Sequence, residues 1–280
     1  MNVRIIKDKM MHAGVVFVTL CTLVPLFAII YSVVAKGIGQ INWDFFTKVT
    51  PNSMEAMLAV AEGKVIPGGV LQGIVGTLLI VLPATFAAVP FGIGGGIYLY
   101  EKDNSRLAAV LRMIVDMIQG LPSIILGIIV YLWVVVPMKS YSAIAGSVAM
   151  FIMMLPMIVR STEETLRMLP NNLREAGLTL GGTNFRVMMR VMLPSAFGGT
   201  ATGILLAVSR VIGETAPLTL TILGSANVCY DPREPNSAVS LLIWEFYNDP
   251  NMQSLIWSAA LLLLVIVLLL NLLAKKLSKG

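Results

Sequence analysis

An arginine and a glutamate stand four positions apart inside a long apolar stretch, AVSRVIGETAPLTLTILG, which covers residues 207–224. An arginine at mid-membrane costs about 2.5–3.5 kcal/mol on insertion scales, so it is expected to face the interior of a helix bundle or a water-filled path. On a helix, Arg210 and Glu214 lie one turn apart, where each can neutralise the charge of the other. The apolar span covers residues 195–224, which places Arg210 near its midpoint.

Two roles fit this pair. In the first, Arg210 and Glu214 form a structural ion pair that locks helices together. In the second, Arg210 is a transient ligand for an anion in transit, because a guanidinium matches oxyanion oxygens through paired hydrogen bonds and a lysine does not. Glu214 would then hold the arginine while no anion is bound, and it must be paired or protonated as the anion passes. The residues alone leave both roles open.

Two further charged residues lie in or beside apolar runs. Arg160 ends the fourth run, in LPMIVRSTEE, where an arginine can also serve only to orient a helix. Asp116 is a lone acid in the third run, where it can pair with Arg112 or line the cytoplasmic mouth of a path. The chain has one histidine, His12, and its two cysteines belong to no CxxC or Cys/His cluster. We therefore expect no metal, no cofactor and no histidine-based catalysis.

The composition shows which elements must position these residues. Of the 280 residues 57% are hydrophobic and 12% are charged, whereas soluble domains carry about 25% charged residues. The apolar residues form runs long enough to cross a bilayer. We predict an all-α membrane protein, a single transmembrane domain over residues 1–280, with six spans. They lie at about 11–35, 69–100, 107–137, 141–160, 195–224 and 252–274.

The basic residues predict the orientation of these spans. Fourteen of the 20 lysines and arginines fall on the side of the N-terminus and five on the other side. The excess of positive charge marks the cytoplasmic side, so both termini are expected in the cytoplasm. The net charge of +5 could also suggest a nucleic-acid partner, but the basic residues lie at the ends of apolar runs and we expect no nucleic acid. The first run is too long for a signal peptide and is expected to be retained.

Aromatic residues and glycines add detail to this arrangement. Six aromatic residues in the two large outer segments are interpreted as contacts with the water–lipid interface and the lipid itself: Trp43, Phe45, Phe46, Trp244, Phe246 and Tyr247. Glycine pairs four positions apart are expected where another helix approaches closely: Gly69/Gly73, Gly92/Gly96 and Gly199/Gly203. Pro122, in GLPSIILG, predicts a kink in the third span, with or without a gating role.

The connection between the fourth and fifth spans, residues 161–194, predicts ordered structure on the cytoplasmic side. A short helix containing Glu163 is expected to end at Pro170, and a second helix over residues 171–182 to end at Gly181-Gly182. The second helix and its end present small residues, Ala176, Gly177 and Gly181, which suit close docking of a partner. An amphipathic helix that touches only lipid headgroups is the alternative.

The spacing of this connection resembles a motif of a known family. Glu175-Ala176-Gly177, three residues, Gly181, nine residues and Val191-x-Leu193-Pro194 are similar to the EAA loop of bacterial ABC importer permeases, E-A-A, three residues, G, nine residues, I-x-L-P. Gly177 and Val191 depart mildly from that pattern. The resemblance implies the type I ABC importer permease fold, with residues 171–182 as the helix that enters a groove of a separate ATPase subunit.

The residues assigned to ATPase coupling on this basis are Glu175, Ala176, Gly177, Gly181, Leu193 and Pro194. The chain contains no G-x-x-x-x-G-K-[ST] phosphate loop, so ATP hydrolysis is expected from the partner and this chain is expected to be non-catalytic.

Four further stretches are similar to one group within that family, the PstA-type permeases of bacterial phosphate importers. They are NWDFFT with Pro51, GGVLQGIVGTL, GLPSIILG and SRVIGETAPL. The resemblance implies a multi-pass protein of the inner membrane that forms part of a path for inorganic phosphate. Its implied partners are a PstC-type sister permease in a heterodimer, an ATPase dimer and a periplasmic or extracellular phosphate-binding protein. Because intramembrane arginines matter for phosphate passage in that family, Arg210, Glu214 and Arg160 are assigned to the path.

Other functions fit the sequence less well. Within the permease class, another oxyanion such as molybdate or sulfate is the nearest alternative to phosphate. A secondary transporter would need its own coupling-ion site, and one charged pair offers little for that. An intramembrane serine protease lacks a usable histidine, and an aspartyl type would need a second acid opposite Asp116.

Overall fold

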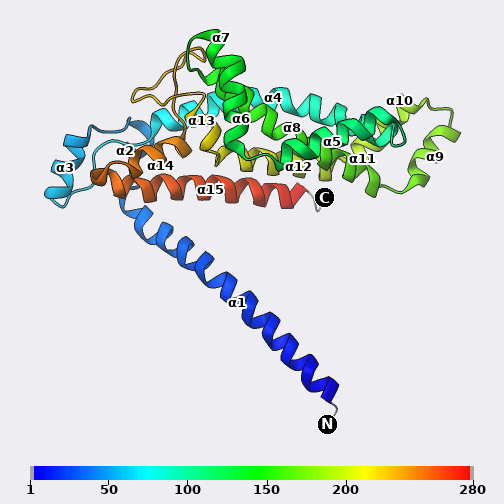
Figure 1. Cartoon of the computed structure of the whole chain (residues 1–280), viewed down its shortest axis with the longest axis horizontal. Helices are drawn as coiled ribbons and strands as arrows, with labels where there is room; N and C mark the ends of the chain where they lie inside the picture. Colours follow the sequence, from blue (N-terminus) through cyan, green and yellow to red (C-terminus); the bar gives the residue numbers. More distant parts are fainter. Residues whose placement is uncertain (1–2, 278–280) are drawn as a thin grey trace.

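The structure is a computed structural model that describes residues 3–277, and over this range the protein is helical, with a single isolated β-bridge between Leu223 and Asn236. Four helices are long and apolar enough to cross a membrane (Figure 1). They are α1 (Val3–Gly37), α4 (Leu71–Glu101), α8 (Ala143–Met168) and α15 (Gln253–Leu277).

Two further spans are bent pairs of helices, which raises the number of spans to as many as six. The first pair joins α5 (Arg106–Gly120) to residues 123–138 at an angle of 105°. The second joins residues 184–195 to α12 (Phe197–Ile212) at 69°. The first bend lies at Leu121-Pro122, because proline disfavours helical geometry in the residue before it. The predicted kink at Pro122 is thus a full break of the helix.

Residues 123–138 and 184–195 are themselves composite. The first comprises α6 (Ser123–Val130), a π-helical turn (Tyr131–Val135) and α7 (Val136–Met138). The second comprises α10 (Asn184–Val187), a π-helical turn (Met188–Met192) and α11 (Leu193–Ser195).

Close helix crossings hold the bundle together at glycines, as the sequence predicts. In α4, Gly92 faces Ile158 of α8, and a Cβ atom added there would lie 2.5 Å from its Cγ2 atom. In α12, a Cβ atom on Gly203 would overlap with the side chain of Ser161. Helix α8 therefore packs between α4 and α12, and small residues allow both approaches.

Helix α1 projects away from the bundle and meets α15 only near its C-terminal end (Figure 1). There the hydroxyl of Ser258 donates to the carbonyl oxygen of Gly37 at 2.6 Å. The Nζ atom of Lys36 lies 4.5 Å from the ring centroid of Trp257. These contacts fix where α1 leaves the bundle.

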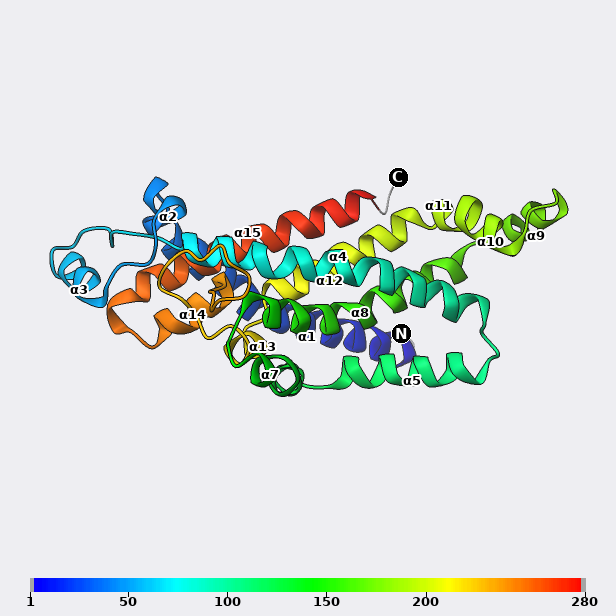
Figure 2. The ribbon, with the colours of Figure 1, turned by 90° about the horizontal axis from the view of Figure 1, so that it is seen from above.

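The two segments that the sequence predicts to lie outside the membrane pack together into one cap at the N-terminal ends of α4 and α15 (Figure 2). We call it the outer cap after that prediction. The cap comprises α2 (Trp43–Thr47), α3 (Ser53–Ala61) and α14 (Val239–Tyr247). The prediction of interface aromatics is wrong for Phe45 and Phe246, which are 0% and 1% exposed. Their rings fill a hydrophobic core inside the cap, whereas Trp43 and Tyr247 are exposed.

Candidate functional site

Arg210 lies in the last turn of α12, two residues before the helix ends at Ile212. Residues 213–215 leave the helix, and a short helix, α13 (Ala216–Thr219), follows. The sequence places Arg210 near the midpoint of a span over residues 195–224, whereas in the structure α12 ends at Ile212 and Arg210 lies beside its end. The helix breaks between Gly213 and Pro217. Glycine has a low helix propensity, and proline favours the first turn of a new helix.

The ion pair between Arg210 and Glu214 is present but loose. The Nε atom of Arg210 lies 3.7 Å from Oε1 of Glu214. This distance exceeds the length of about 2.7–2.9 Å that is typical of a hydrogen bond between two charged groups. Among residues 3–277, the guanidinium makes one other polar contact, with the sulfur atom of Met157 at 3.8 Å. The side chain of Arg210 is 52% exposed and that of Glu214 is 19% exposed. Most of the five N–H donors of this arginine thus have no acceptor among residues 3–277.

The break after α12 is held by the outer cap. The hydroxyl of Ser240, in the first turn of α14, donates to the carbonyl oxygen of Glu214 at 2.8 Å. The hydroxyl of Thr215 donates in return to the carbonyl oxygen of Ser240 at 3.4 Å. The segment that carries Glu214 is therefore attached to α14 by two hydrogen bonds.

A second charged cluster surrounds Glu163, whose side chain is 2% exposed. Its Oε1 atom accepts from Arg112 Nε at 2.8 Å and from Arg167 Nη2 at 3.0 Å, and its Oε2 atom accepts from Arg160 Nη1 at 3.3 Å. The expectation of a separate surface helix around Glu163 is wrong, because α8 continues without a break to Met168. The signal that could have revealed this is the spacing of Arg160, Glu163 and Arg167, which places all three on one helix face.

Arg160 is fully engaged by the protein. It donates from Nε to Oδ1 of Asp116 at 3.0 Å and from Nη2 to Oδ2 at 2.6 Å, and from Nη1 to Glu163. The partner of Asp116, which the sequence left open, is thus Arg160 and not Arg112. Because Asp116 lies in α5, this pair ties α5 to α8.

Asp103, in the turn between α4 and α5, completes this cluster. One of its oxygens accepts from Arg167 and from Arg112, both at 2.5 Å. The hydrogen bond from Arg167, followed by the one from Arg112, lowers the pKa of the Asp103 carboxyl below its ordinary value of 3.8. No local pattern in the sequence distinguishes Asp103 from a solvated loop residue.

The candidate coupling loop contains α9 (Asn171–Thr179), which begins after Pro170 as expected. Gly181 has φ +82°, a left-handed backbone that ends the helix and favours glycine. The absence of a side chain at Gly177 lets Val187 pack closely against α9, because a Cβ atom at residue 177 would lie 2.9 Å from the methyl groups of Val187. Glu175 and Ala176 remain exposed, and Leu180 is 89% exposed. Gly177 is partly exposed, so its small size also serves the packing of the loop against Val187.

The sequence was compared with known families and proteins. Residues 88–280 match the family described as "Binding-protein-dependent transport system inner membrane component". The chain belongs to this family. Permeases of binding-protein-dependent transporters are multi-pass, non-catalytic subunits of the inner membrane that act with an ATPase and a substrate-binding protein.

Curated relatives extend the similarity over almost the whole permease. The "Phosphate transport system permease protein PstA" of Pasteurella multocida is 34% identical over 97% of this chain and 94% of its own length. The protein of the same name from Yersinia pestis is 38% identical over 88% of this chain and 81% of its own length. The "Probable phosphate transport system permease protein PstA" of Methanocaldococcus jannaschii is 35% identical, over 95% and 92%.

Solved structures support the fold of the permease. A chain of the MetNI methionine ABC transporter in an inward-facing conformation has a TM-score of 0.63 at 20% identity, over 75% of this chain and 94% of that one. A chain of an amino acid ABC transporter with histidines has a TM-score of 0.53 at 16% identity, over 82% and 99%. Both likenesses concern the fold alone.

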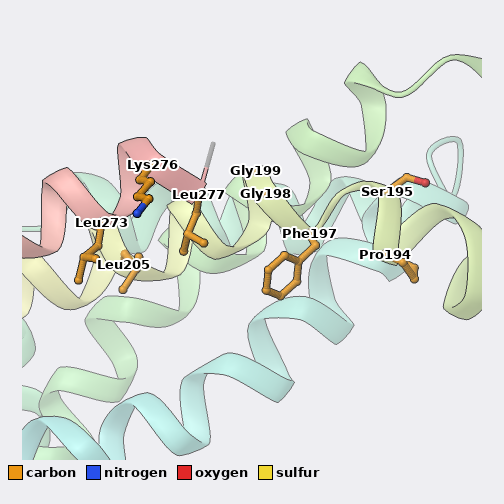
Figure 3. Close-up of a pocket in the computed structure, with 9 residues that line it drawn as sticks. All are labelled: Pro194, Ser195, Phe197, Gly198, Gly199, Leu205, Leu273, Lys276 and Leu277. Carbon is orange, nitrogen blue, oxygen red and sulfur yellow. The ribbon is translucent and has the colours of Figure 1, made fainter. Parts of the chain in front are cut away.

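The permease also has a cavity of about 910 Å³ beside the coupling loop (Figure 3). It lies between the start of α12 and the C-terminal end of α15, and its walls include Phe197, Leu205 and Leu273. Pro194, the last residue of the EAA-like motif, and Lys276 also line it. None of the three candidate path residues lies there, so this cavity is separate from the candidate path. No cluster that could hold a metal ion occurs among the described residues.

Proposed function

We propose that this chain forms part of the path for inorganic phosphate through an ATP-driven importer, in the role of the PstA-type permease. The names of the curated relatives, all phosphate transport system permeases, support phosphate as the cargo. The proposed partners are a PstC-type sister permease, an ATPase dimer and a phosphate-binding protein outside the membrane. Both termini lie in the cytoplasm in this proposal, in accord with the distribution of lysine and arginine.

The looseness of the Arg210–Glu214 pair is the observation that carries the proposal for the path. Arg160 is held more firmly, because it meets Asp116 through two hydrogen bonds of 2.6 and 3.0 Å. Arg210 instead reaches Glu214 at 3.7 Å and leaves half of its side chain exposed. An arginine held in this way is neutralised at rest yet can turn to a phosphate ion without breaking a strong hydrogen bond first.

Arg160 is the second arginine of the proposed path. Its guanidinium is held by Asp116 and Glu163, so a phosphate ion would have to compete with two carboxylates. We therefore assign the first contact with the anion to Arg210 and a later one to Arg160. Glu214 acts as the resting partner of Arg210.

Coupling to the ATPase is proposed to run through α9 and the residues that follow it. Glu175 and Ala176 are exposed on α9, and Gly181 forms the turn after it. Gly177 supports this surface from inside the loop by allowing Val187 to pack closely. Leu193 and Pro194 begin α11, which leads into α12 and thus towards Arg210.

Uptake by the reconstituted four-component importer tests this function. The chain is purified with its co-expressed partners, placed in liposomes that contain ATP-regenerating components inside, and supplied with radiolabelled phosphate and the binding protein. We expect uptake that depends on ATP and that excess unlabelled molybdate or sulfate does not compete away. Competition by either ion would point to the other oxyanion instead, and uptake without the ATPase would point to a secondary transporter.

A further inference from the structure

Ser240 is 3% exposed and lies in α14, which belongs to the outer cap and not to a membrane span. Its hydroxyl is nonetheless bonded to the backbone of Glu214, at the break after α12, at 2.8 Å. A residue of the cap therefore reaches the resting partner of Arg210.

The break after α12 leaves a backbone carbonyl group without a helical donor, and the hydrogen bond from Ser240 satisfies it. The N–H groups of Gly213 and Glu214 still donate to the carbonyl oxygens of Arg210 and Val211, so the end of α12 satisfies them. The carbonyl group of Glu214 has no such helical partner and accepts from Ser240. Irregular backbone at membrane depth is tolerated where other protein groups satisfy it, and Ser240 is the group that does so here.

The position of Ser240 is in turn set by α4. The N–H group of its neighbour Val239 donates to the hydroxyl of Thr77 at 3.1 Å. Gly73 lets the same turn approach, since a Cβ atom there would lie 2.5 Å from Leu242. The start of α14 is thus fixed on α4, so that Ser240 holds Glu214 against a part of the bundle that does not contain Arg210.

We propose that Ser240 is a positioning residue for the Arg210–Glu214 pair. By fixing the backbone of Glu214 against α4, it keeps the carboxylate near enough to neutralise Arg210 and too far to clamp it. Thr215 supports the same geometry through its bond back to Ser240. This inference rests on the proposed role of Arg210 in the path and adds a residue from the outer cap to it.

A thiol probe at residue 214 tests the positioning without reference to phosphate. Glu214→Cys is made in a chain with Cys21→Ala and Cys229→Ala, and its rate of modification by a charged methanethiosulfonate is measured in the assembled importer. Adding Ser240→Ala is expected to change that rate about fivefold, the factor that corresponds to one net hydrogen bond. Ser240→Thr, which keeps the hydroxyl, is expected to restore the original rate.

Ser258→Ala is the matched control, because the Ser258 hydroxyl is also buried and also donates to a backbone carbonyl, that of Gly37. It is expected to leave the rate at residue 214 within about twofold of the original. Equal rates with serine and alanine at residue 240 would overturn the inference. So would an equal change caused by Ser258→Ala.

Uptake measurements then link the positioning to transport. Ser240→Ala is expected to lower the maximal rate of phosphate uptake about fivefold and to leave KM and co-purification of the ATPase unchanged. In a Glu214→Gln background the same substitution is expected to have no further effect, because the carboxylate that Ser240 positions is already absent. Additive losses would overturn the inference. If Arg210→Ala transports normally while the thiol result holds, the proposed path fails and the positioning stands.

Discussion

Arg160 of α8 donates to both carboxylate oxygens of Asp116 in α5, at 3.0 Å from Nε and 2.6 Å from Nη2. The same guanidinium also reaches Glu163, the acceptor for three arginines. Arg210, by comparison, has one carboxylate at 3.7 Å. Arg160 is thus held firmly by carboxylates, whereas Arg210 is held loosely.

Arg210→Ala is expected to abolish phosphate uptake and to leave assembly with the ATPase intact, since the side chain contributes little to packing. Arg210→Lys is expected to retain only a small part of the uptake, because lysine lacks the planar fork of donors. Uptake in liposomes and co-purification of the ATPase measure the two effects. Arg106→Ala, at an exposed arginine of α5, is the control that should behave as the unmodified chain.

The opposite result would identify a structural pair. If Arg210→Ala fails to assemble and Arg210→Lys restores both assembly and full uptake, the arginine serves the fold and the proposed path is wrong.

Glu163→Gln is expected to destabilise the protein by about 3 kcal/mol or more, because it removes the buried charge that three arginines share. Thermal unfolding of the purified chain in detergent measures the effect as a lower Tm. Glu164→Gln, at the exposed neighbouring residue, should leave Tm nearly unchanged. Equal values for the two variants would show that the cluster contributes nothing to stability.

The lowered pKa of Asp103 predicts how the stability that its ion pairs provide depends on pH. Its carboxyl has a lower pKa in the folded protein than the ordinary value of 3.8, because Arg167 and Arg112 donate to it. The stabilisation it gives is therefore complete above that ordinary value and disappears as the pH falls through the folded pKa. We expect Asp103→Asn to lower Tm at neutral pH, and the difference to shrink as the pH falls below 3.8 and to vanish below the pKa of the folded protein. A difference that persists in acid would show that the ionised carboxylate is not its source.

Two substitutions of Gly181 distinguish the effect of side-chain bulk from the effect of backbone strain in the coupling loop. Gly181→Trp is expected to block association with the ATPase, because the side chain would project from a site where nothing lies within 4 Å. Gly181→Asn is the matched variant, since asparagine tolerates the left-handed backbone at φ +82° and adds little bulk. Co-purification of the ATPase should be lost with tryptophan and kept with asparagine. Normal co-purification of the tryptophan variant would refute the docking assignment.

The sequence by itself determined the class, the number of apolar runs and the family motif. Apolar runs of bilayer length are a local property, so the membrane class and most spans could be predicted from composition and length. The break at Pro122 and the turn at Gly181 were also predictable, because proline and glycine act on their own backbone. The spacing from Glu175 to Pro194 could be compared with a family pattern without any structure.

Only the tertiary structure decided which polar residues meet. Glu163 follows a predicted span and looks solvated in sequence, yet arginines from α5 and α8 bury it. Phe246 suits a lipid interface by type, yet the cap encloses it. Ser240 carries no sequence signal at all, because its partner, Glu214, lies 26 positions away. Pairings at such separations depend on how whole helices pack, and local patterns of hydrophobicity and charge do not specify that packing.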